Sequence, residues 1–204
     1  MNSHNAPPRP FARGRKVFLR DDVLADIEKY VYWKTHGEWR EYDAPWEGIW
    51  TSLNQEQQEK LIRRFIKSCN TGIQVPRKRA TIATLRDNPI GWVSRYVRER
   101  FPDVWYVGID IAEDNYLNKG IGTEALGLWV DYLFTDSTVH KIALDTWSFN
   151  TRMMRVAEKL GFMHEGVERE LIQWRGQRLD LIHFGMLRRE WEEKRRAARG
   201  DNVL

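Results

Sequence analysis

Two glycines, Gly120 and Gly122, stand where the chain could bind a phosphate. They follow an apolar run over 104–111 and lead into a helix-like run that continues to Phe134, so the order predicts strand, turn and helix. The start of a helix carries unpaired backbone N–H groups and the positive end of the helix dipole, which together attract anions. Because glycine has no Cβ, a phosphate could approach those N–H groups closely. The segment 118–123 is therefore predicted to bind a phosphate-containing cofactor.

Neither of the two common phosphate-binding motifs describes this loop. A P-loop requires G-x-x-x-x-G-K-[ST], and the sequence contains no such run. A Rossmann fingerprint requires G-x-G-x-x-G and, about 20 residues later, an acidic residue closing a parallel βαβ unit. Ala125 takes the place of the third glycine, and neither Asp136 nor Asp145 stands convincingly at the end of a second parallel strand. The loop therefore indicates a different cofactor-binding family.

The order of segments around the loop resembles the GNAT superfamily of acyl-CoA-dependent N-acetyltransferases, and within it the RimJ/RimL-like branch. The family's pyrophosphate loop, [R/Q]-x-x-G-x-[G/A], has Leu117 here in place of its polar first residue. Three segments carry the resemblance: the loop 117–122, the helix-like run from Asn150 to Phe162, and the pairing of 165–173 with 178–187 across a Trp-Arg-Gly-Gln turn. Together they extend the resemblance over roughly residues 15 to 192.

The resemblance implies an α/β fold with a mixed, mostly antiparallel central sheet flanked by helices. It also implies acetyl-CoA as co-substrate, with no metal. The residues that it places against acetyl-CoA are Ile109, Ile111, Asn118, Lys119, Gly120, Ile121, Gly122, Thr123, Asn150 and Met153. The Asn150 side chain offers a donor and an acceptor to a pantetheine amide, and it could equally cap the helix that follows. Many family members have serine where this chain has Met153, which can pack against pantetheine but cannot donate a proton.

Asp110 is the expected catalytic residue. It lies on the predicted central strand, ten residues before Gly120. Direct acetyl transfer needs a group that takes the proton of the attacking amine, but it needs no nucleophilic side chain. The run Gly108-Ile109-Asp110 also resembles some aminoglycoside 6′-N-acetyltransferases, in which that aspartate contacts the acceptor amine. The alternative is that Asp110 only shapes the strand. The general acid is left open between solvent, a tyrosine such as Tyr116, and direct release of the thiolate.

The segment 33–50 is unusually rich in tryptophan, with four of them interleaved with acidic and basic residues. Aromatic rings can stack on a ligand cation while carboxylates attract it. The resemblance places this segment beside the groove for the acceptor amine. The residues expected to bind the acceptor are Trp39, Glu41, Tyr42 and Trp46. The alternatives are a small aromatic core that braces a long loop, with Trp50 as its clearest member, or part of a dimer surface.

The elements that position these residues follow from periodicity and turn signals. Helices are predicted over 22–33, with Asp21 or Asp22 as N-cap, and over 54–68. Strands are predicted over 17–20, 80–85, 90–96, 104–111 and 141–147. The first sixteen residues hold three prolines and four basic residues, which predicts a disordered arm over 1–15. A single domain over 16–192 and a charged tail over 193–204 complete the expected organisation.

Composition indicates one soluble domain. The chain has 204 residues, of which 42% are hydrophobic, and no apolar stretch approaches the ~18 residues of a membrane helix. A single cysteine, Cys69, and the lack of a hydrophobic signal-like segment fit a cytoplasmic protein. Five scattered histidines give no metal-ligand spacing. The net charge of +4 is modest and mixed with acidic residues, which does not favour nucleic acid as a partner.

Three functional hypotheses follow. The leading one is transfer of an acetyl group from acetyl-CoA to a primary amine of a small molecule, peptide or protein. The second narrows the acceptor to an aminoglycoside or a polyamine, because of Asp110 and the acidic, aromatic segment. The third is a catalytically weak acyl-CoA-binding module with a regulatory role, suggested by Leu117 and Met153. The oligomeric state, including a homodimer, is left open by the sequence.

Overall fold

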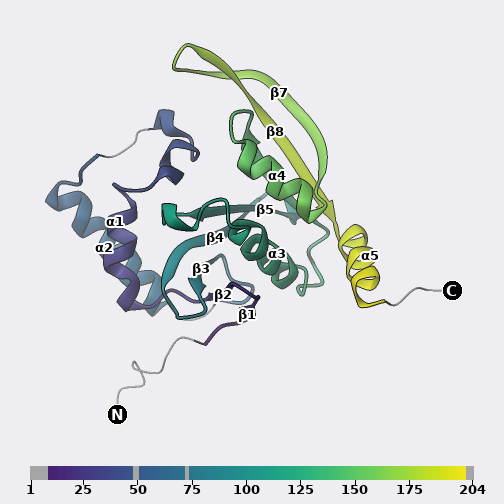
Figure 1. Ribbon diagram of the computed structural model, residues 1–204, viewed down its shortest axis with the longest axis horizontal. Coiled ribbons are helices and arrows are strands. Elements are labelled where there is room, and N and C mark those ends of the chain that lie inside the picture. Colours follow the sequence, from purple (N-terminus) through teal and green to yellow (C-terminus); the bar gives the residue numbers. More distant parts are fainter. Residues whose placement is uncertain (1–8, 48–50, 72–73, 201–204) are drawn as a thin grey trace. The chain divides into compact units, whose positions relative to one another are not determined.

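A computed structural model describes residues 9–47, 51–71 and 74–200 (Figure 1). The helices are α1 (Ile27–Trp33), α2 (Gln55–Asn70), α3 (Ile121–Leu133), α4 (Thr151–Leu160) and α5 (Arg188–Arg199). The strands are β1 (Ala12–Arg13), β2 (Val17–Arg20), β3 (Arg79–Thr84), β4 (Pro89–Arg98), β5 (Phe101–Ile111), β6 (Lys141–Trp147), β7 (Met163–Trp174) and β8 (Gln177–Leu187). Short 3₁₀ turns are η2 (Leu24–Asp26), η3 (Glu38–Glu41), η4 (Pro45–Glu47) and η5 (Asp114–Tyr116).

The strands form a sheet in the order β1-β2-β3-β4-β5-β6-β8-β7. Antiparallel pairing joins β1 to β2, β2 to β3, β3 to β4, β6 to β8 and β8 to β7, whereas β5 and β6 are parallel. The predicted α/β fold with a mixed, mostly antiparallel sheet is therefore confirmed. The strands predicted over 17–20 and 141–147 have the bounds of β2 and β6.

The first predicted helix begins later than expected. The prediction over 22–33 with an aspartate N-cap is wrong at its start, because Val23 is extended and a 3₁₀ turn precedes α1. The carboxylate of Asp22 instead accepts hydrogen bonds from Arg79 and Thr81, so it is committed to β3. The second helix follows its prediction closely. Asn54 caps α2 by accepting a hydrogen bond from the backbone N–H of Gln57 at 2.9 Å.

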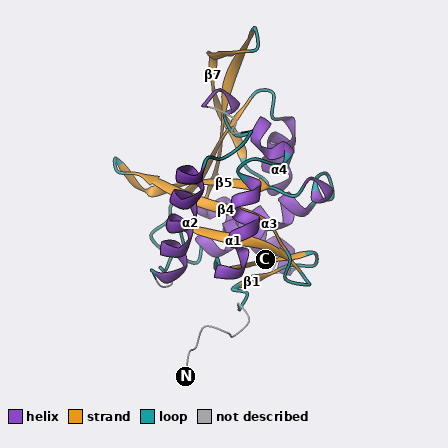
Figure 2. Ribbon diagram, turned by 90° about the vertical axis from the view of Figure 1, so that its left-hand side faces the viewer, coloured by secondary structure: helices purple, strands orange, loops and turns teal. Residues whose placement is uncertain are grey.

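The chain divides into two compact units, and β4 and β5 each contribute residues to both. The first lies within Met1–Ser94 and Ile109–Trp129. Its α1 and α2 lie side by side (Figure 1 and Figure 2), and its buried side chains include Val17, Leu19, Phe65, Ile82, Val93, Leu126 and Trp129. The second lies within Arg95–Gly108 and Val130–Leu204. Its core includes Leu133, Ile142, Leu144, Phe184 and Met186.

The ends of the chain carry more regular structure than expected. Residues 12 and 13, inside the predicted disordered arm, form β1 and pair with Leu19 and Phe18 of β2. Residues 193–199, inside the predicted tail, belong to α5. In the second unit β7 and β8 form the long hairpin of Figure 1, and Arg175 and Gly176 make its turn with positive φ. The single domain over 16–192 remains a prediction.

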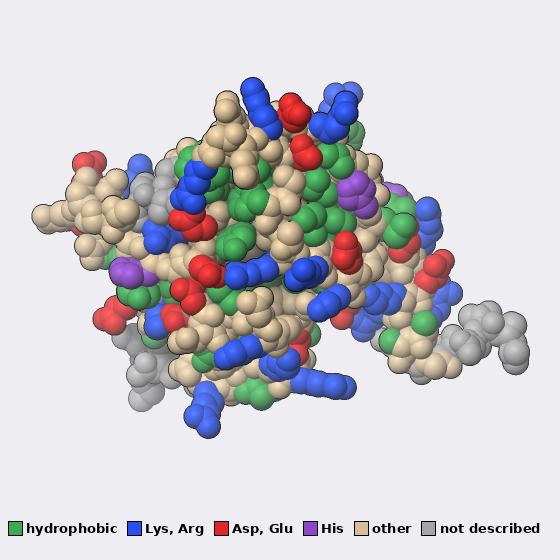
Figure 3. All heavy atoms as spheres, turned by 45° about the horizontal axis from the view of Figure 1, so that its top comes forward, with side chains coloured by type: hydrophobic (Ala, Val, Ile, Leu, Met, Phe, Trp, Pro, Cys, Tyr) green, Lys and Arg blue, Asp and Glu red, His purple; other side chains and the backbone are tan. Residues whose placement is uncertain are grey.

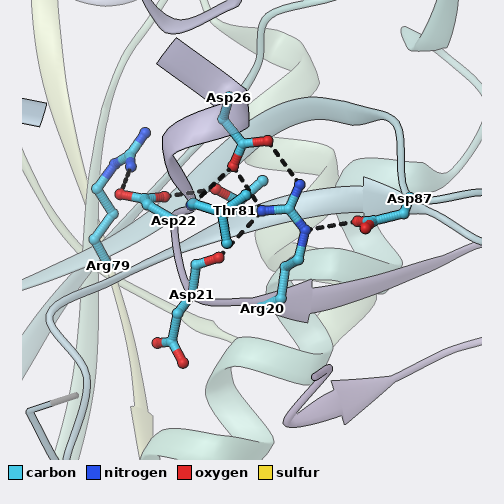
Figure 4. Close-up of polar contacts among 8 residues, drawn as sticks. Arg20, Asp21, Asp22, Asp26, Arg79, Thr81 and Asp87 are labelled. Atoms are coloured by element: carbon cyan, nitrogen blue, oxygen red, sulfur yellow. Dashed lines mark hydrogen bonds and ion pairs between the residues drawn. The ribbon is translucent and has the colours of Figure 1, made fainter. Parts of the chain in front are cut away.

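A network of ion pairs fixes the corner between β2 and α1 (Figure 4). The Arg20 side chain is 1% exposed, and its guanidinium donates to both oxygens of Asp26 at 2.6 and 2.8 Å and to Asp87 at 2.6 Å. Bidentate arginine–carboxylate pairs have a fixed geometry, so the network sets the direction in which the chain leaves β2. Beside it Asp22 lies between Arg79 and Thr81, which ties the first residue of β3 to the start of the helical corner.

Charge is spread over the surface in both signs. The face in Figure 3 has Lys and Arg side chains interspersed with Asp and Glu. Among the helices of the described residues, none is both long enough and apolar enough to cross a membrane.

Candidate functional site

The predicted phosphate loop connects η5 to α3 and has the geometry of an anion-binding turn. Asn118 and Gly120 have positive φ of 58° and 74°, and residues 118–120 are exposed. The carbonyl of Gly120 accepts the first hydrogen bond of the helix from the N–H of Glu124 at 3.1 Å. The N–H groups of the first turn therefore have no partner within the helix and can serve a ligand. The order of strand, turn and helix predicted around Gly120 is confirmed.

Lys16, which directly precedes β2, is hydrogen-bonded to this loop and to the first turn of α3. Its Nζ donates to the carbonyl of Lys119 at 2.7 Å, and its backbone N–H donates to Glu124 Oε1 at 2.7 Å. A Cβ built on Gly120 would lie 3.4 Å from Lys16 Nζ, so an ammonium stands against the outer side of the glycine turn. The loop thus combines oriented N–H groups with a fixed positive charge, and these residues fit a pyrophosphate.

Asp110 lies near the end of β5, where β4 comes unusually close. A Cβ built on Gly91 of β4 would lie only 2.0 Å from the carbonyl oxygen of Asp110, so no side chain fits at position 91. Next to this contact, the N–H of Ala112 donates to the carbonyl of Ile90 at 2.8 Å. Of the two neighbours predicted to face acetyl-CoA, Ile111 is buried and Ile109 is partly exposed.

The carboxyl group of Asp110 is electrostatically unusual. Desolvation by burial, and then repulsion from Asp43, raise its pKa to about 7, against the opposing attraction of Lys34 and Arg79. The residue as a whole is partly exposed. A carboxyl group with a pKa near 7 is partly protonated at neutral pH and can exchange a proton with a bound amine. This is the property that a general base requires.

Two cations and three aromatic rings surround the same region. Lys34 Nζ lies 5.0 Å from the ring centre of Tyr30, 5.5 Å from that of Trp39 and 5.1 Å from that of Trp92. We call these three rings the aromatic cage. The Arg79 guanidinium carbon lies 5.4 and 5.3 Å from the rings of Tyr30 and Trp92. Such distances are those of cation–π contacts.

The tryptophan-rich segment builds part of this cage. Trp39 meets Trp92 edge to face at 4.9 Å, and its Nε1 donates to the carbonyls of Trp33 and His36, both at 3.2 Å. Trp33 is buried with Trp92 and Ala112. The bracing role considered for this segment therefore holds for Trp33 and Trp39.

The other predicted acceptor residues lie on or near the short turns of this segment. Glu41 ends η3, Tyr42 follows it, and Trp46 belongs to η4, all partly buried. Their contact with an acceptor stays a prediction, and Trp50 lies outside the described residues.

Comparison with known proteins identifies the family. The family model described as "Acetyltransferase (GNAT) domain" matches residues 16–163, which is more than half of the chain. The chain belongs to the GNAT acetyltransferase family.

The names of similar curated proteins point to different acceptors. Aminoglycoside N(6')-acetyltransferase type 1 of Klebsiella pneumoniae is 37% identical over 95 residues, which are 42% of this chain and 47% of the relative. The putative ribosomal N-acetyltransferase YdaF of Bacillus subtilis is 31% identical over 86 residues, 42% of this chain and 46% of the relative. The chain thus spans less than half the length of these curated relatives.

The fold is also found among solved structures. The spermidine N-acetyltransferase from Vibrio cholerae, solved in complex with CoA and spermine, has a TM-score of 0.67 and 20% identity. The match covers 86% of this chain and 98% of the other. At this level of identity the likeness establishes a shared GNAT fold.

Two of the predicted cofactor residues of this GNAT chain lie in the second compact unit. Asn150 caps α4, because its Oδ1 accepts a hydrogen bond from the backbone N–H of Met153 at 3.1 Å. The cap uses only the carbonyl oxygen of the amide, so the Nδ2 group is not consumed by it. The helix-cap interpretation therefore holds, and pantetheine binding by Asn150 and Met153 stays a prediction.

Several residues around Asp110 were not selected from the sequence of this GNAT protein. They are Lys16 at the loop, Lys34, Asp43 and Arg79 near the carboxylate, and Trp92 in the aromatic cage. Asp43 could have been found, because it lies inside the acidic, aromatic segment. Nothing in the spacing of Arg79 or Trp92 connects them to Asp110, since the contact depends on how β3, β4 and β5 pack.

Other polar residues have structural partners. His183 lies between two carboxylates, with Nδ1 2.7 Å from Asp145 and Nε2 2.9 Å from Glu168. Desolvation raises the pKa of the Cys69 thiol to about 11, so it stays protonated at neutral pH. In the part of the chain that the structure describes, no group of three or more His, Cys, Asp or Glu side chains is placed to hold a metal ion.

Removing the charge of Asp43 should move the acidic limb of the pH–rate profile to lower pH. Repulsion from Asp43 raises the pKa of Asp110, so Asp43→Asn should lower that pKa and allow the carboxylate to form in more acidic solution. The measurement is kcat/KM for an accepted amine between about pH 5 and 9. Glu56→Gln, on an exposed part of α2, is the matched control. A limb that stays in place or moves to higher pH would contradict the coupling.

Proposed function

We propose that the protein is an acetyl-CoA-dependent N-acetyltransferase that acetylates a primary amine by direct attack. The observation that carries the proposal is Asp110, a carboxyl group whose pKa is raised to about 7 in the same compact unit as the phosphate loop. Family membership supports the class of reaction. The RimJ/RimL-like branch is proposed from the loop and from the YdaF relative, with the cytoplasm as the place of action.

The proposed reaction uses the observed groups in sequence. The N–H groups of the loop 118–123 and the Lys16 ammonium hold the pyrophosphate of acetyl-CoA. The acceptor enters as an ammonium and gives a proton to Asp110 or to a water held by it. Its nitrogen then attacks the thioester carbonyl, the new N–C bond forms, and the C–S bond breaks. The nitrogen still carries one surplus proton after the attack, and this proton passes by way of water to the departing thiolate, so that a neutral amide and free CoA thiol leave without any covalent enzyme intermediate.

Two alternatives differ in what they predict. An aminoglycoside or polyamine acceptor is favoured by the names of the K. pneumoniae relative and the V. cholerae structure. A catalytically weak acyl-CoA-binding module is favoured by Met153, which cannot serve as a general acid. Release of free CoA thiol from acetyl-CoA, followed with a panel of monoamines, polyamines, aminoglycosides and peptide α-amines, separates these functions. If acetyl-CoA raises the melting temperature but no amine causes release of its thiol, the result would favour the binding module and contradict the enzymatic function.

The acceptor role of the segment 38–47 makes its own prediction. Glu41→Gln removes a carboxylate expected to attract the ammonium, so the KM for the acceptor should rise several-fold, as for a partly exposed ion pair worth about 0.5–1 kcal/mol. The KM for acetyl-CoA should not change, because other residues hold that substrate. Glu59→Gln on the exposed face of α2 is the control. If the KM for acetyl-CoA rises while that for the amine does not, Glu41 is not an acceptor residue.

A further inference from the structure

The aromatic cage holds a cation that belongs to the protein itself. Lys34 leaves the C-terminal end of α1 and places its Nζ 5.0 to 5.5 Å from the rings of Tyr30, Trp39 and Trp92. Trp92 directly follows Gly91, the residue whose Cα packs against the carbonyl of Asp110. The ammonium therefore lies over aromatic rings next to the predicted base, where an acceptor cation would be expected to bind.

The charges around Lys34 differ from those around its neighbour Arg79. Arg79 is committed to an ion pair with Asp22 at the corner shown in Figure 4. Within the described residues, Lys34 has no such ion pair, and its contacts are the three rings. Desolvation, the largest influence, lowers the pKa of the Lys34 amine, as does repulsion from Arg79 and Arg64. Attraction to Asp110 and Asp43 opposes this shift. Around Asp110, two carboxylates thus face the cations of Lys34 and Arg79, so this region is not strongly anionic.

We propose that Lys34 is a specificity-determining residue, whose ammonium occupies the aromatic cage beside Asp110 and so selects amines with one positive charge over polycations. This inference rests on the proposed N-acetyltransferase function and names the class of its acceptor. A monoamine can place its single ammonium at Asp110, where the proton is removed. A diamine must place its second ammonium near the resident cations, and such like-charge contacts are unfavourable.

The test compares two amines of the same length. Pentylamine carries one ammonium group at neutral pH, and 1,5-diaminopentane carries two on the same five-carbon chain. Their affinities for the full chain are measured by calorimetry and by quenching of tryptophan fluorescence, without acetyl-CoA. The variants are Lys34→Met, which keeps an unbranched apolar chain in the cage, and Lys34→Gln, which keeps polarity without charge. Lys60→Met, on an exposed site of α2, is the matched control.

The wild-type protein should bind pentylamine at least as tightly as the diamine. In Lys34→Met and Lys34→Gln the affinity for the diamine relative to pentylamine should rise about tenfold, because one like charge is gone and the rings can accept a ligand cation. Lys60→Met should keep the wild-type ratio. The ratio is the useful quantity, because losing Lys34 also raises the pKa of Asp110, which changes the affinity for both amines together.

Three outcomes would overturn the inference. A folded variant with an unchanged ratio would show that Lys34 does not control charge selection, and so would wild-type protein that prefers the diamine. Failure of both variants to bind either amine would show that the cage is not an acceptor position. Thiol release with the same two amines keeps the proposed function separate. If no protein transfers acetyl groups but the binding ratio shifts as expected, the N-acetyltransferase proposal fails and the charge selection stands.

Discussion

Replacing Asp110 by asparagine should lower kcat by roughly 10²–10⁴-fold at neutral pH, which is the usual contribution of a positioned general base. The amide keeps the shape and the hydrogen-bonding capacity of the side chain but cannot take a proton from the amine. Binding of acetyl-CoA should stay close to that of the wild type, because its phosphates are expected to be bound by backbone groups of the loop 118–123. Asp103→Asn, an exposed carboxylate on the same strand, is the matched control and should leave kcat unchanged.

The pH profile distinguishes a base from a residue that shapes the strand. Since burial raises the pKa of Asp110 to about 7, the wild-type rate should increase as pH rises through that value and the carboxylate forms. In Asp110→Asn this limb should disappear from the residual rate. A decrease of only a few-fold with an unchanged profile would show that Asp110 acts on the strand alone, and water or another group would then deprotonate the amine.

The same shift has a consequence for stability, with a defined sign. A carboxyl group whose pKa is raised on folding binds its proton more tightly in the folded state than in the unfolded chain. Its favourable contribution is complete below the usual carboxyl pKa and is lost as pH rises through about 7. The free energy of unfolding of Asp110→Asn should therefore exceed that of the wild type most clearly above neutral pH. Urea titrations at acidic and alkaline pH measure this difference and also confirm that the variant is folded.

The parts of the site that depend on local sequence were predictable. Glycines after an apolar run specify a turn and a helix start, because the φ and N–H requirements are met within a few residues. Asn150 satisfies a helix start in the same local way. The bounds of β6 follow from a short apolar run between turns, and the structure has the predicted residues.

The electrostatic environment of Asp110 was not predictable from the sequence. Lys34 follows α1, Asp43 lies between η3 and η4, and Arg79 begins β3, so the tertiary fold brings residues that are far apart in the sequence near Asp110. The late start of α1 is likewise caused by contacts between residues far apart in the sequence. Asp22 has the side chain of a good N-cap, but Arg79 and Thr81 of β3 bind its carboxylate instead. Tertiary contacts of this kind leave no periodic trace in the sequence. The segment 33–50 includes Lys34, but its composition does not show that this lysine lies over the rings of Tyr30, Trp39 and Trp92.

The second large effect is expected at the loop, where Gly122→Val should weaken acetyl-CoA binding by about ten- to a hundredfold. Gly122 lies in the first turn of α3, two residues after the left-handed Gly120. Two added methyl groups would stand between the pyrophosphate and the N–H groups of that turn. A hydrogen bond to a charged group is worth about 1.5–3 kcal/mol, so the loss of one such contact accounts for the expected range. Calorimetry with acetyl-CoA gives the affinity, and circular dichroism checks that the variant is folded.

Two controls show whether the pyrophosphate is the group affected. Gly122→Ala should bind acetyl-CoA nearly as well as the wild type, because the GNAT motif that the loop resembles accepts glycine or alanine there. S-acetyl-pantetheine lacks the pyrophosphate, so its affinity should be the same in Gly122→Val and in the wild type. Equal acetyl-CoA affinity in a folded Gly122→Val protein would remove the loop from the cofactor site. If S-acetyl-pantetheine loses affinity to the same extent as acetyl-CoA, the valine disturbs the pantetheine path, and the phosphates must be held by other residues.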